Sequence, residues 1–338
     1  MGLMFDKVKL INYDKLNRIA RDIAERNDTT TGRVKRDMVR NFLVHGIGYT
    51  DYMKGDYINL TRQQKKTFLT TRNYDKLLKY LNDSTYTGVF VDKITFNKVF
   101  REYIGRDFLD LRTAGPEEFA AFMEKNRGRK IFAKPNADYG GHGIECFTVD
   151  DDLDFEERRK KCLENGQYLV EEAIIQHEEI NRMCPFAVNT FRIVSLVKDN
   201  VPYILENAMR TNSDESVALS CDDVFMRLSP DGRVVSNVVD DLMNTYDDHP
   251  VTGVPFSEMR IPYVREAYEM IERAAMEVPE VRYVGWDVAI GQDGPVIIEG
   301  NQYPSYGLVQ YFMLEDEHEG HLKKIAAVLG DELKKAGI

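Results

Sequence analysis

Two apolar runs in the last quarter of the chain have the pattern of paired β-strands. Val284–Ile290 and Pro295–Gly300 are separated by Gly-Gln-Asp-Gly, and turn residues between two such runs are typical of a β-hairpin. Both runs are rich in Val and Ile, so both faces of the hairpin are expected to be buried. Asp287 and Glu299 interrupt them. The placement of these two acids constrains the fold more than any other feature, because their alignment depends on the turn.

The turn decides whether the two carboxylates face each other. A three-residue loop, Gln292–Gly294 with Gly294 in the left-handed conformation, places Asp287 directly opposite Glu299 and Gly285 opposite Asn301. A two-residue loop at Gln292–Asp293 would instead separate the two acids, because a shift of one residue turns a side chain to the other face of the sheet. Glycine is the usual residue at the third position, so we predict the three-residue loop.

Two facing carboxylates destabilise a strand pair unless a cation lies between them. Mg²⁺ is commonly held by one or two carboxylates together with substrate phosphates, and an amide oxygen is a suitable further ligand. Asp287, Glu299 and Asn301 are therefore predicted metal ligands. The alternative is an edge hairpin whose acids are solvated.

A glycine-rich segment follows an earlier predicted strand, Lys130–Lys134. Pro135 ends that strand, and the segment after it contains Tyr-Gly-Gly-His-Gly at residues 139–143. Glycines allow backbone N–H groups to turn toward an anion, and a lysine supplies a point charge to a phosphate. Taken alone the segment is more typical of a tight turn, because it matches neither common nucleotide-binding fingerprint.

The remaining pattern predicts an α+β protein. Residues 1–85 have helical spacing of apolar residues, and residues 86–338 alternate helices with strands joined by hairpin turns, so the sheet should be largely antiparallel. We divide the second region into a central lobe at about 128–172, which holds the glycine loop, and a C-terminal lobe at about 173–338.

Composition excludes several classes of protein. The formal net charge of −11 argues against a general nucleic-acid binder, although a local site can still bind a small anion. No apolar stretch approaches the length needed to cross a bilayer. The four cysteines contain no C-x-x-C pair, which favours a reducing cytoplasm over a disulfide framework.

The order of these motifs resembles the ATP-grasp superfamily, and more narrowly its sugar-transfer-associated family. The resemblance covers most of the chain. It rests on the following residues: Asp92-Lys93, Lys134-Pro135 with Gly140-Gly141-x-Gly143, Tyr168-Leu169-Val170-Glu171-Glu172, Gln176-His177, Asn189-Thr190-Phe191-Arg192, Gly285-Trp286-Asp287 and Glu299-Gly300-Asn301. It implies an ATP-grasp fold of two α/β lobes that grip ATP, preceded here by a mostly helical region.

The resemblance also implies a role for each residue. Lys93 and Lys134 would contact the ATP phosphates, under a loop that carries Gly140, Gly141 and Gly143. Glu171 and Glu172 would lie at the hinge that binds adenine, and Glu178, or its neighbour Glu179, would accept from the ribose hydroxyls. Arg192 would stabilise the transferring phosphoryl group. Asp287, Glu299 and Asn301 would hold one or two Mg²⁺ ions, with Mn²⁺ as an alternative.

The implied activity is the ATP-dependent joining of a small-molecule carboxylate to an amine or thiol through an acyl phosphate. Such chemistry needs positioning and charge neutralisation more than a protein nucleophile. The family association suggests work on cell-surface saccharides or in secondary metabolism. Two alternatives stay open at this point, namely a small-molecule kinase on the same scaffold and a non-catalytic nucleotide-binding module.

Overall fold

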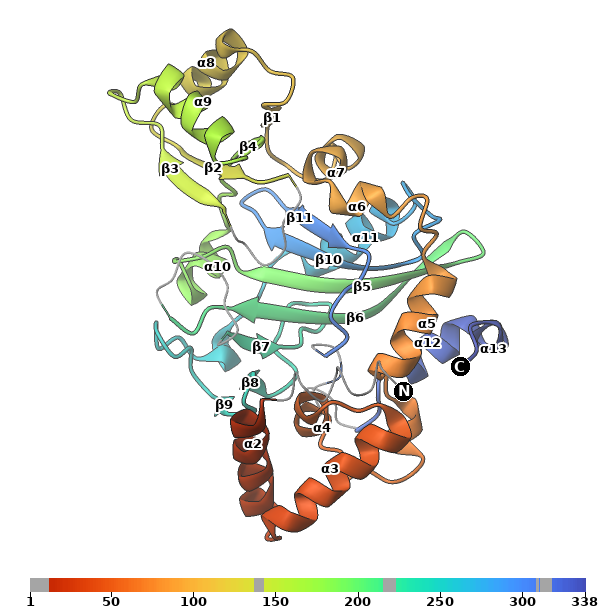
Figure 1. Cartoon of the computed structure of the whole chain (residues 1–338). Helices are drawn as coiled ribbons and strands as arrows, with labels where there is room; N and C mark the ends of the chain where they lie inside the picture. The colour runs from red at the N-terminus through yellow and green to blue at the C-terminus, as the bar shows by residue number, and fades with distance from the viewer. Residues whose placement is uncertain (1–11, 137–142, 215–222, 308–309, 311–317) are drawn as a thin grey trace. The chain divides into compact units, whose positions relative to one another are not determined.

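A computed structural model describes the chain except for residues 1–11, 137–142, 215–222, 308–309 and 311–317 (Figure 1). The chain forms two compact units. One consists of Met1–Tyr80 together with Ser305–Ile338, and the other is Leu81–Pro304. Residues 305–338 thus lie with the N-terminal unit, whereas the sequence pattern had grouped them with the catalytic region.

The first unit is helical. Asn12 caps its first described helix by accepting a hydrogen bond from the Lys15 N–H, and Ile19 and Ile23 bury the apolar face that the sequence pattern predicts. The C-terminal segment joins this unit through the buried side chain of Gln310, whose amide oxygen accepts from the Leu69 N–H at 2.6 Å. Its described helices are α2 (Tyr13–Arg26), α3 (Thr31–His45), α4 (Tyr49–Lys54), α5 (Thr71–Leu81), α12 (Leu322–Leu329) and α13 (Glu332–Lys335).

The second unit contains a small antiparallel sheet. Within the described residues its strands lie in the order β1-β4-β2-β3, where β1 is Phe108–Asp110, β2 Lys130–Lys134, β3 Glu145–Thr148 and β4 Leu169–Glu172. Helices α8 (Pro116–Lys125) and α9 (Phe155–Glu164) bury Phe119, Met123 and Cys162 against Ile131 and Val170 of this sheet (Figure 1). Each strand is short, so the helices supply most of the apolar burial that stabilises this lobe.

A larger antiparallel sheet forms the rest of this unit. Trp286, Phe191 and Ile193 point from it into the main core, where they meet Ile271 of α11 (Val264–Ala274). Its described strands lie in the order β11-β10-β5-β6-β7-β8-β9 (Figure 1). Their bounds are β5 Thr190–Lys198, β6 Val201–Thr211, β7 Val224–Met226, β8 Val238–Asp240, β9 Thr245–Tyr246, β10 Tyr283–Ile290 and β11 Pro295–Asn301.

The edge strand β11 is covered rather than left open. Helices α6 (Gly88–Val91) and α7 (Lys93–Val99) lie beside it (Figure 1), and the Ile297 N–H donates to the carbonyl of Tyr103 at 2.8 Å. Covering an edge in this way satisfies backbone groups that would otherwise be open to pairing with another chain.

The strand predicted at Lys130–Lys134 is β2, and the two apolar runs predicted to pair correspond to β10 and β11. Within the described residues, no helix combines the length and the apolar character needed to cross a membrane.

Candidate functional site

The β10–β11 hairpin places Asp287 directly opposite Glu299, and Gly285 opposite Asn301. This alignment confirms the predicted register, but the predicted turn is wrong. At the turn Ile290 faces Pro295, and the Gly291 N–H donates to the Gly294 carbonyl at 2.8 Å, which leaves only Gln292 and Asp293 at the tip. Gly294 has φ of 145°, outside the predicted left-handed helical conformation.

A β-bulge restores the alignment that this turn would destroy. The register shifts between Asp287 and Val288, because Val288 faces Ile297 whereas Asp287 faces Glu299. Ile298 is therefore the extra residue on β11. An unpaired residue of this kind re-aims the side chains that follow it, and here it turns Glu299 onto the face that carries Asp287.

Arg192 and Asn301 contact Asp287 from two sides. Arg192 faces Asp287 across the β5–β10 pair and forms a two-pronged ion pair with it, with Nε to Oδ1 at 2.6 Å and Nη2 to Oδ2 at 2.8 Å. The Asn301 amide nitrogen lies 3.4 Å from Asp287 Oδ2 and 3.2 Å from Glu299 Oε1. The two acids, the amide and the guanidinium thus form one connected cluster on one face of the sheet.

The carboxyl of Glu299 is held in an unfavourable environment for its charge. Burial and the neighbouring Asp287 raise its pKa, while the Asn301 hydrogen bond and the positive charge of Lys93 oppose that rise. A cation placed between the two acids would remove the repulsion.

The contact of α6 and α7 with β11 determines where Lys93 lies. A side chain at Gly300 would meet the rings of Phe90 and Phe96 at 2.9 Å, so glycine permits this close approach. Asp92 caps α7 by accepting from the Thr95 N–H at 2.6 Å. Lys93, the first residue of α7, is thereby placed where its charge acts on Glu299.

The start of the glycine-rich segment is tied to this helix end. The side chain of Asn136 donates to Asp92 at 2.5 Å and accepts from the Ile94 N–H at 3.1 Å. The backbone carbonyl of Asn136 also accepts a hydrogen bond from the Lys93 N–H at 3.0 Å. The segment after Pro135 therefore begins beside Lys93.

Lys134 lies at the end of β2 and pairs with Glu171 of β4. Glu171 is buried, and its second oxygen meets Arg106 Nε at 3.0 Å and the Asn97 side-chain amide at 3.1 Å. Burial alone would raise the pKa of Glu171, but the charges of Arg106 and Lys134 outweigh it and lower the pKa to about 2. Glu171 is thus ionised near neutral pH and pairs with two cations.

This geometry accompanies a match over most of the chain. The sequence matches the family model described as sugar-transfer associated ATP-grasp over residues 75–318. The chain belongs to that ATP-grasp family. The α+β fold predicted from the sequence, an ATP-grasp fold with a largely antiparallel sheet after a mostly helical region, is thereby confirmed.

A comparison with solved structures matched several ligases and carboxylases. A D-Ala:D-Ser ligase from Enterococcus faecalis is 14% identical, with a TM-score of 0.45, over 76% of this chain and 64% of its own. A biotin carboxylase from Campylobacter jejuni is 12% identical, with a TM-score of 0.46, over 72% of this chain and 47% of its own. N5-carboxyaminoimidazole ribonucleotide synthetase is 11% identical, with a TM-score of 0.42, over 67% of this chain and 52% of its own. This ATP-grasp chain thus spans less than two thirds of each of these proteins. A comparison with curated proteins found no match.

The remaining acids expected at an ATP-grasp site are Glu172, Glu178 and Glu179, and their surroundings differ from one another. Glu172 points to the face opposite Glu171, where its carboxylate accepts from the Asp107 N–H at 2.9 Å and lies 3.5 Å from Lys125. Glu178 is exposed at the start of α10 (Glu178–Met183), and Glu179 pairs with Arg182 at 3.1 Å. The geometry gives Glu172 structural partners and leaves Glu178 and Glu179 both open as ribose contacts.

The glycine loop is described only at its end. Gly140 and Gly141 lie outside the described residues. Gly143 has φ of 70°, and a side chain there would meet the Pro135 ring at 2.8 Å, so both its backbone angle and its packing favour glycine.

Gln176 and Trp286 hold the two strands that carry the Arg192–Asp287 pair. The buried Gln176 amide oxygen accepts from the Asn189 N–H at 2.7 Å, just before β5 begins. The Trp286 ring N–H donates to Ser195 Oγ at 2.8 Å, which ties β10 to β5. Such buried contacts limit the movement of the strands and therefore of the site.

Two residues that contact Glu171 were not identified from the sequence. Arg106 and Asn97 both contact Glu171, yet they are 65 and 74 residues away from it along the chain. No local pattern marks an arginine or asparagine as buried, because these residues are mostly exposed in proteins.

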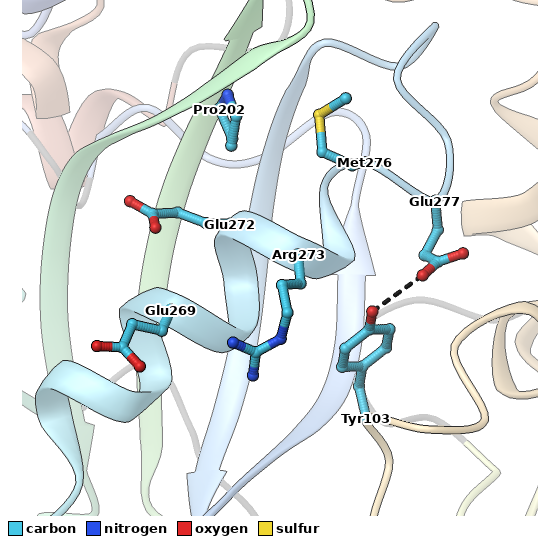
Figure 2. A pocket seen from close by; sticks show the side chains of 7 residues that line it. All are labelled: Tyr103, Pro202, Glu269, Glu272, Arg273, Met276 and Glu277. Atoms are coloured by element: carbon cyan, nitrogen blue, oxygen red, sulfur yellow. Dashed lines mark hydrogen bonds between the residues drawn. The ribbon is translucent and has the colours of Figure 1, made fainter.

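A surface groove of about 600 Å³ has none of the predicted site residues in its lining. It is lined by Glu269, Glu272 and Arg273 of α11 together with Tyr103, Pro202, Met276 and Glu277 (Figure 2). Among the described residues no group of three or more His, Cys, Asp and Glu side chains is arranged to hold a metal ion. The case for a metal therefore rests on two carboxylates and an amide.

Proposed function

We propose that this ATP-grasp chain binds ATP with Mg²⁺, or Mn²⁺, and uses it to join a carboxylate to an amine or thiol. The observation that carries the proposal is the alignment of Asp287 with Glu299, with Asn301 within reach of both. Mg²⁺ favours a small number of carboxylates together with phosphate oxygens.

The donor set fits such an ion. A carboxylate can accept at about four positions, and Asp287 uses three of them, two for Arg192 and one for Asn301. Turning the Asn301 amide by half a turn would release one acceptor position on each acid and present its oxygen to the same space. Asp287, Glu299 and Asn301 would then be the protein ligands.

Two lysines and an arginine supply the remaining positive charge. In the proposed complex Lys93 and Lys134 contact the phosphates, and a metal held by Asp287, Glu299 and Asn301 would supply further neutralisation of the phosphate charge. Arg192, fixed by its two bonds to Asp287, stabilises the charge on the group in transfer. Arg192 and Lys134 are therefore the proposed catalytic residues.

In the proposed reaction a substrate carboxylate oxygen attacks the γ-phosphorus and the bond to the β-phosphate oxygen breaks, which releases ADP. The amine or thiol then attacks the acyl carbon, loses a proton, and expels inorganic phosphate. The chain needs no nucleophile of its own for either step. We propose that adenine lies at the hinge near Glu171 and Glu172, that the loop of Gly140, Gly141 and Gly143 closes over the phosphates, and that Glu178 binds the ribose.

The family description supports a further step. Because the family is associated with sugar transfer, we propose that the substrates belong to cell-surface saccharide assembly or a related secondary pathway, in the cytoplasm. This step rests on analogy.

The test supplies purified protein with Mg²⁺, ATP and panels of carboxylates, amines and thiols, and measures ADP, phosphate and product mass. Equal amounts of ADP and phosphate with an amide or thioester product are expected, and the activity should be lost in Asp287→Asn but kept in Glu266→Gln, an exposed acid on α11. A substrate that gains the mass of a phosphate would show a kinase instead. Absence of Mg²⁺-dependent ATP binding by calorimetry would indicate a module without this chemistry.

A further inference from the structure

Arg106 is a buried arginine whose contacts reach both lobes of the ATP-grasp unit. Its side chain is 3% exposed, as is that of its ion-pair partner Glu171. An arginine guanidinium carries five N–H donors in a fixed plane, so one side chain can hold several acceptors in a set geometry.

On one side Arg106 holds the bulge of β11. Nη1 donates to the Ile297 carbonyl at 2.8 Å and to the Ile104 carbonyl at 3.0 Å, and Nη2 donates to the Ile298 carbonyl at 3.3 Å. Ile298 is the extra residue that brings Glu299 opposite Asp287. The same guanidinium therefore holds the two peptide groups that precede Glu299.

The segment that carries Arg106 is fixed closely against β11. The Tyr103 carbonyl accepts from the Ile297 N–H at 2.8 Å, and the Tyr103 hydroxyl donates to Glu277 at 2.9 Å (Figure 2). A side chain at Gly105, which has φ of 58°, would come within 2.2 Å of Val296 Cγ1. Only glycine allows the backbone to approach β11 this closely at that angle.

On the other side Arg106 shares Glu171 with Lys134. Arg106 Nε lies 3.0 Å from Glu171 Oε2, and Lys134 holds the other oxygen. The single carboxylate of Glu171 thus offsets part of the positive charge of both Arg106 and Lys134. If Arg106 were withdrawn, Glu171 would act on Lys134 alone and draw it more strongly away from a phosphate.

We propose that Arg106 is a positioning residue for the Mg²⁺–ATP site: it holds the bulge that aligns Glu299 with Asp287 and, through Glu171, sets the position of Lys134. This inference rests on the proposed function, because it assigns Arg106 to the same site. Arg106 acts on Asp287, Glu299 and Lys134 indirectly, through Glu171 and the carbonyls of Ile297 and Ile298.

The experiment compares Arg106→Lys, Gly105→Ala and the control Arg101→Lys, with folding checked by circular dichroism and thermal melting. Arg101 is on the same segment but pairs with Asp107 at the surface, where both side chains are more than a third exposed. One readout is amide hydrogen exchange at Ile297 without nucleotide. The other is the Mg²⁺ concentration that half-saturates ATP binding. Both variants keep the charge of the segment: Arg106→Lys loses the planar fork of donors, and Gly105→Ala disturbs the same backbone contact, so agreement between them excludes a simple charge effect.

Arg106→Lys and Gly105→Ala should each speed exchange at Ile297 by about tenfold and raise the half-saturating Mg²⁺ concentration by a similar factor, while Arg101→Lys changes neither. Unchanged exchange at Ile297 in a folded Arg106→Lys protein would overturn the inference and leave the proposed function intact. Faster exchange with an unchanged Mg²⁺ requirement would also overturn it, because the arginine would then serve folding only. Wild-type protein that binds no ATP with Mg²⁺ would overturn the proposed function, whatever the exchange shows.

Discussion

Asp287 faces Glu299 across the β10–β11 pair, although the turn joining the two strands has the register that would set Asp287 opposite Ile298. The bulge at Ile298 resolves this conflict. The consequence is that two acids are held together on a buried face, with burial and mutual repulsion raising the pKa of Glu299. A site of this kind stores an unfavourable interaction that a bound cation can relieve.

Glu299→Gln should therefore stabilise the metal-free protein while removing Mg²⁺-dependent ATP binding. Removing one of two facing like charges is expected to increase the free energy of unfolding by on the order of 0.5–1 kcal/mol near pH 8. Because the pKa of Glu299 is raised in the fold, its ionised form costs stability only as pH rises above the ordinary value of 4.5, so the gain should vanish near pH 4. Urea unfolding at pH 8 and at pH 4, with Glu266→Gln as the control, measures this change in the free energy of unfolding. If Glu299→Gln were instead less stable than wild type at pH 8, the positive charge of Lys93 would outweigh the repulsion between Glu299 and Asp287.

Glu171→Gln should be strongly destabilising, by about 3–5 kcal/mol, because it leaves the buried Arg106 and the partly buried Lys134 without their counter-charge. The pKa of Glu171 is lowered to about 2, so its contribution is present above the unfolded-state pKa and is lost as pH falls toward 2. The stabilities of wild type and variant should therefore converge in acid. Glu172→Gln is the matched control, since Glu172 is the neighbouring acid on the opposite face and should cost about 1–2 kcal/mol. Equal losses in the two variants would contradict the buried-ion account.

Gly300→Ala should move α6 and α7 away from β11. The added carbon would meet Phe90 and Phe96 at 2.9 Å, and overpacking of this kind costs about 1–3 kcal/mol. Because Lys93 begins α7, ATP affinity should fall as well, and Phe90→Leu in the same protein should restore part of both losses. Gly88→Ala is the control, since nothing lies within 4 Å of a side chain at that position of α6. An unchanged melting temperature in Gly300→Ala would mean that the aromatic rings move aside freely.

How far the sequence predicts this site can be seen in the hairpin itself. The period of two along a strand left two registers open, and the prediction that Asp287 faces Glu299 rested on a three-residue turn. The route to that alignment was predicted wrongly. Its cause is a set of contacts from Gly105 and Arg106, which are about 190 residues away along the chain, and no turn rule includes such contacts.

The lysine site shows the same division between local and long-range information. A strand ending in Lys134-Pro135 was predictable from residue types, and β2 ends at Lys134. That Lys134 would pair with Glu171, and that Arg106 and Asn97 would hold the same carboxylate, depends on how β4, α7 and the segment before β1 meet in space. Pairing between distant segments is determined by packing, which single-residue propensities do not contain.

Binding of ATP should stabilise the fold only when a divalent ion is present. A ligand at about one hundred times its dissociation constant adds about 2.7 kcal/mol to the free energy of unfolding, which is easily measured as a rise in melting temperature. The rise should disappear with a chelator, return with Mg²⁺ or Mn²⁺, and be absent in Asp287→Asn, which keeps the shape of the side chain but loses its charge. Asn301→Asp separates charge from geometry in the same assay, because it adds a third carboxylate beside Glu299 and should strengthen ion binding while lowering the stability of the metal-free protein. An ATP-induced rise that persists with a chelator would place the binding energy in the lysines and Arg192 and not in the Asp287–Glu299 pair.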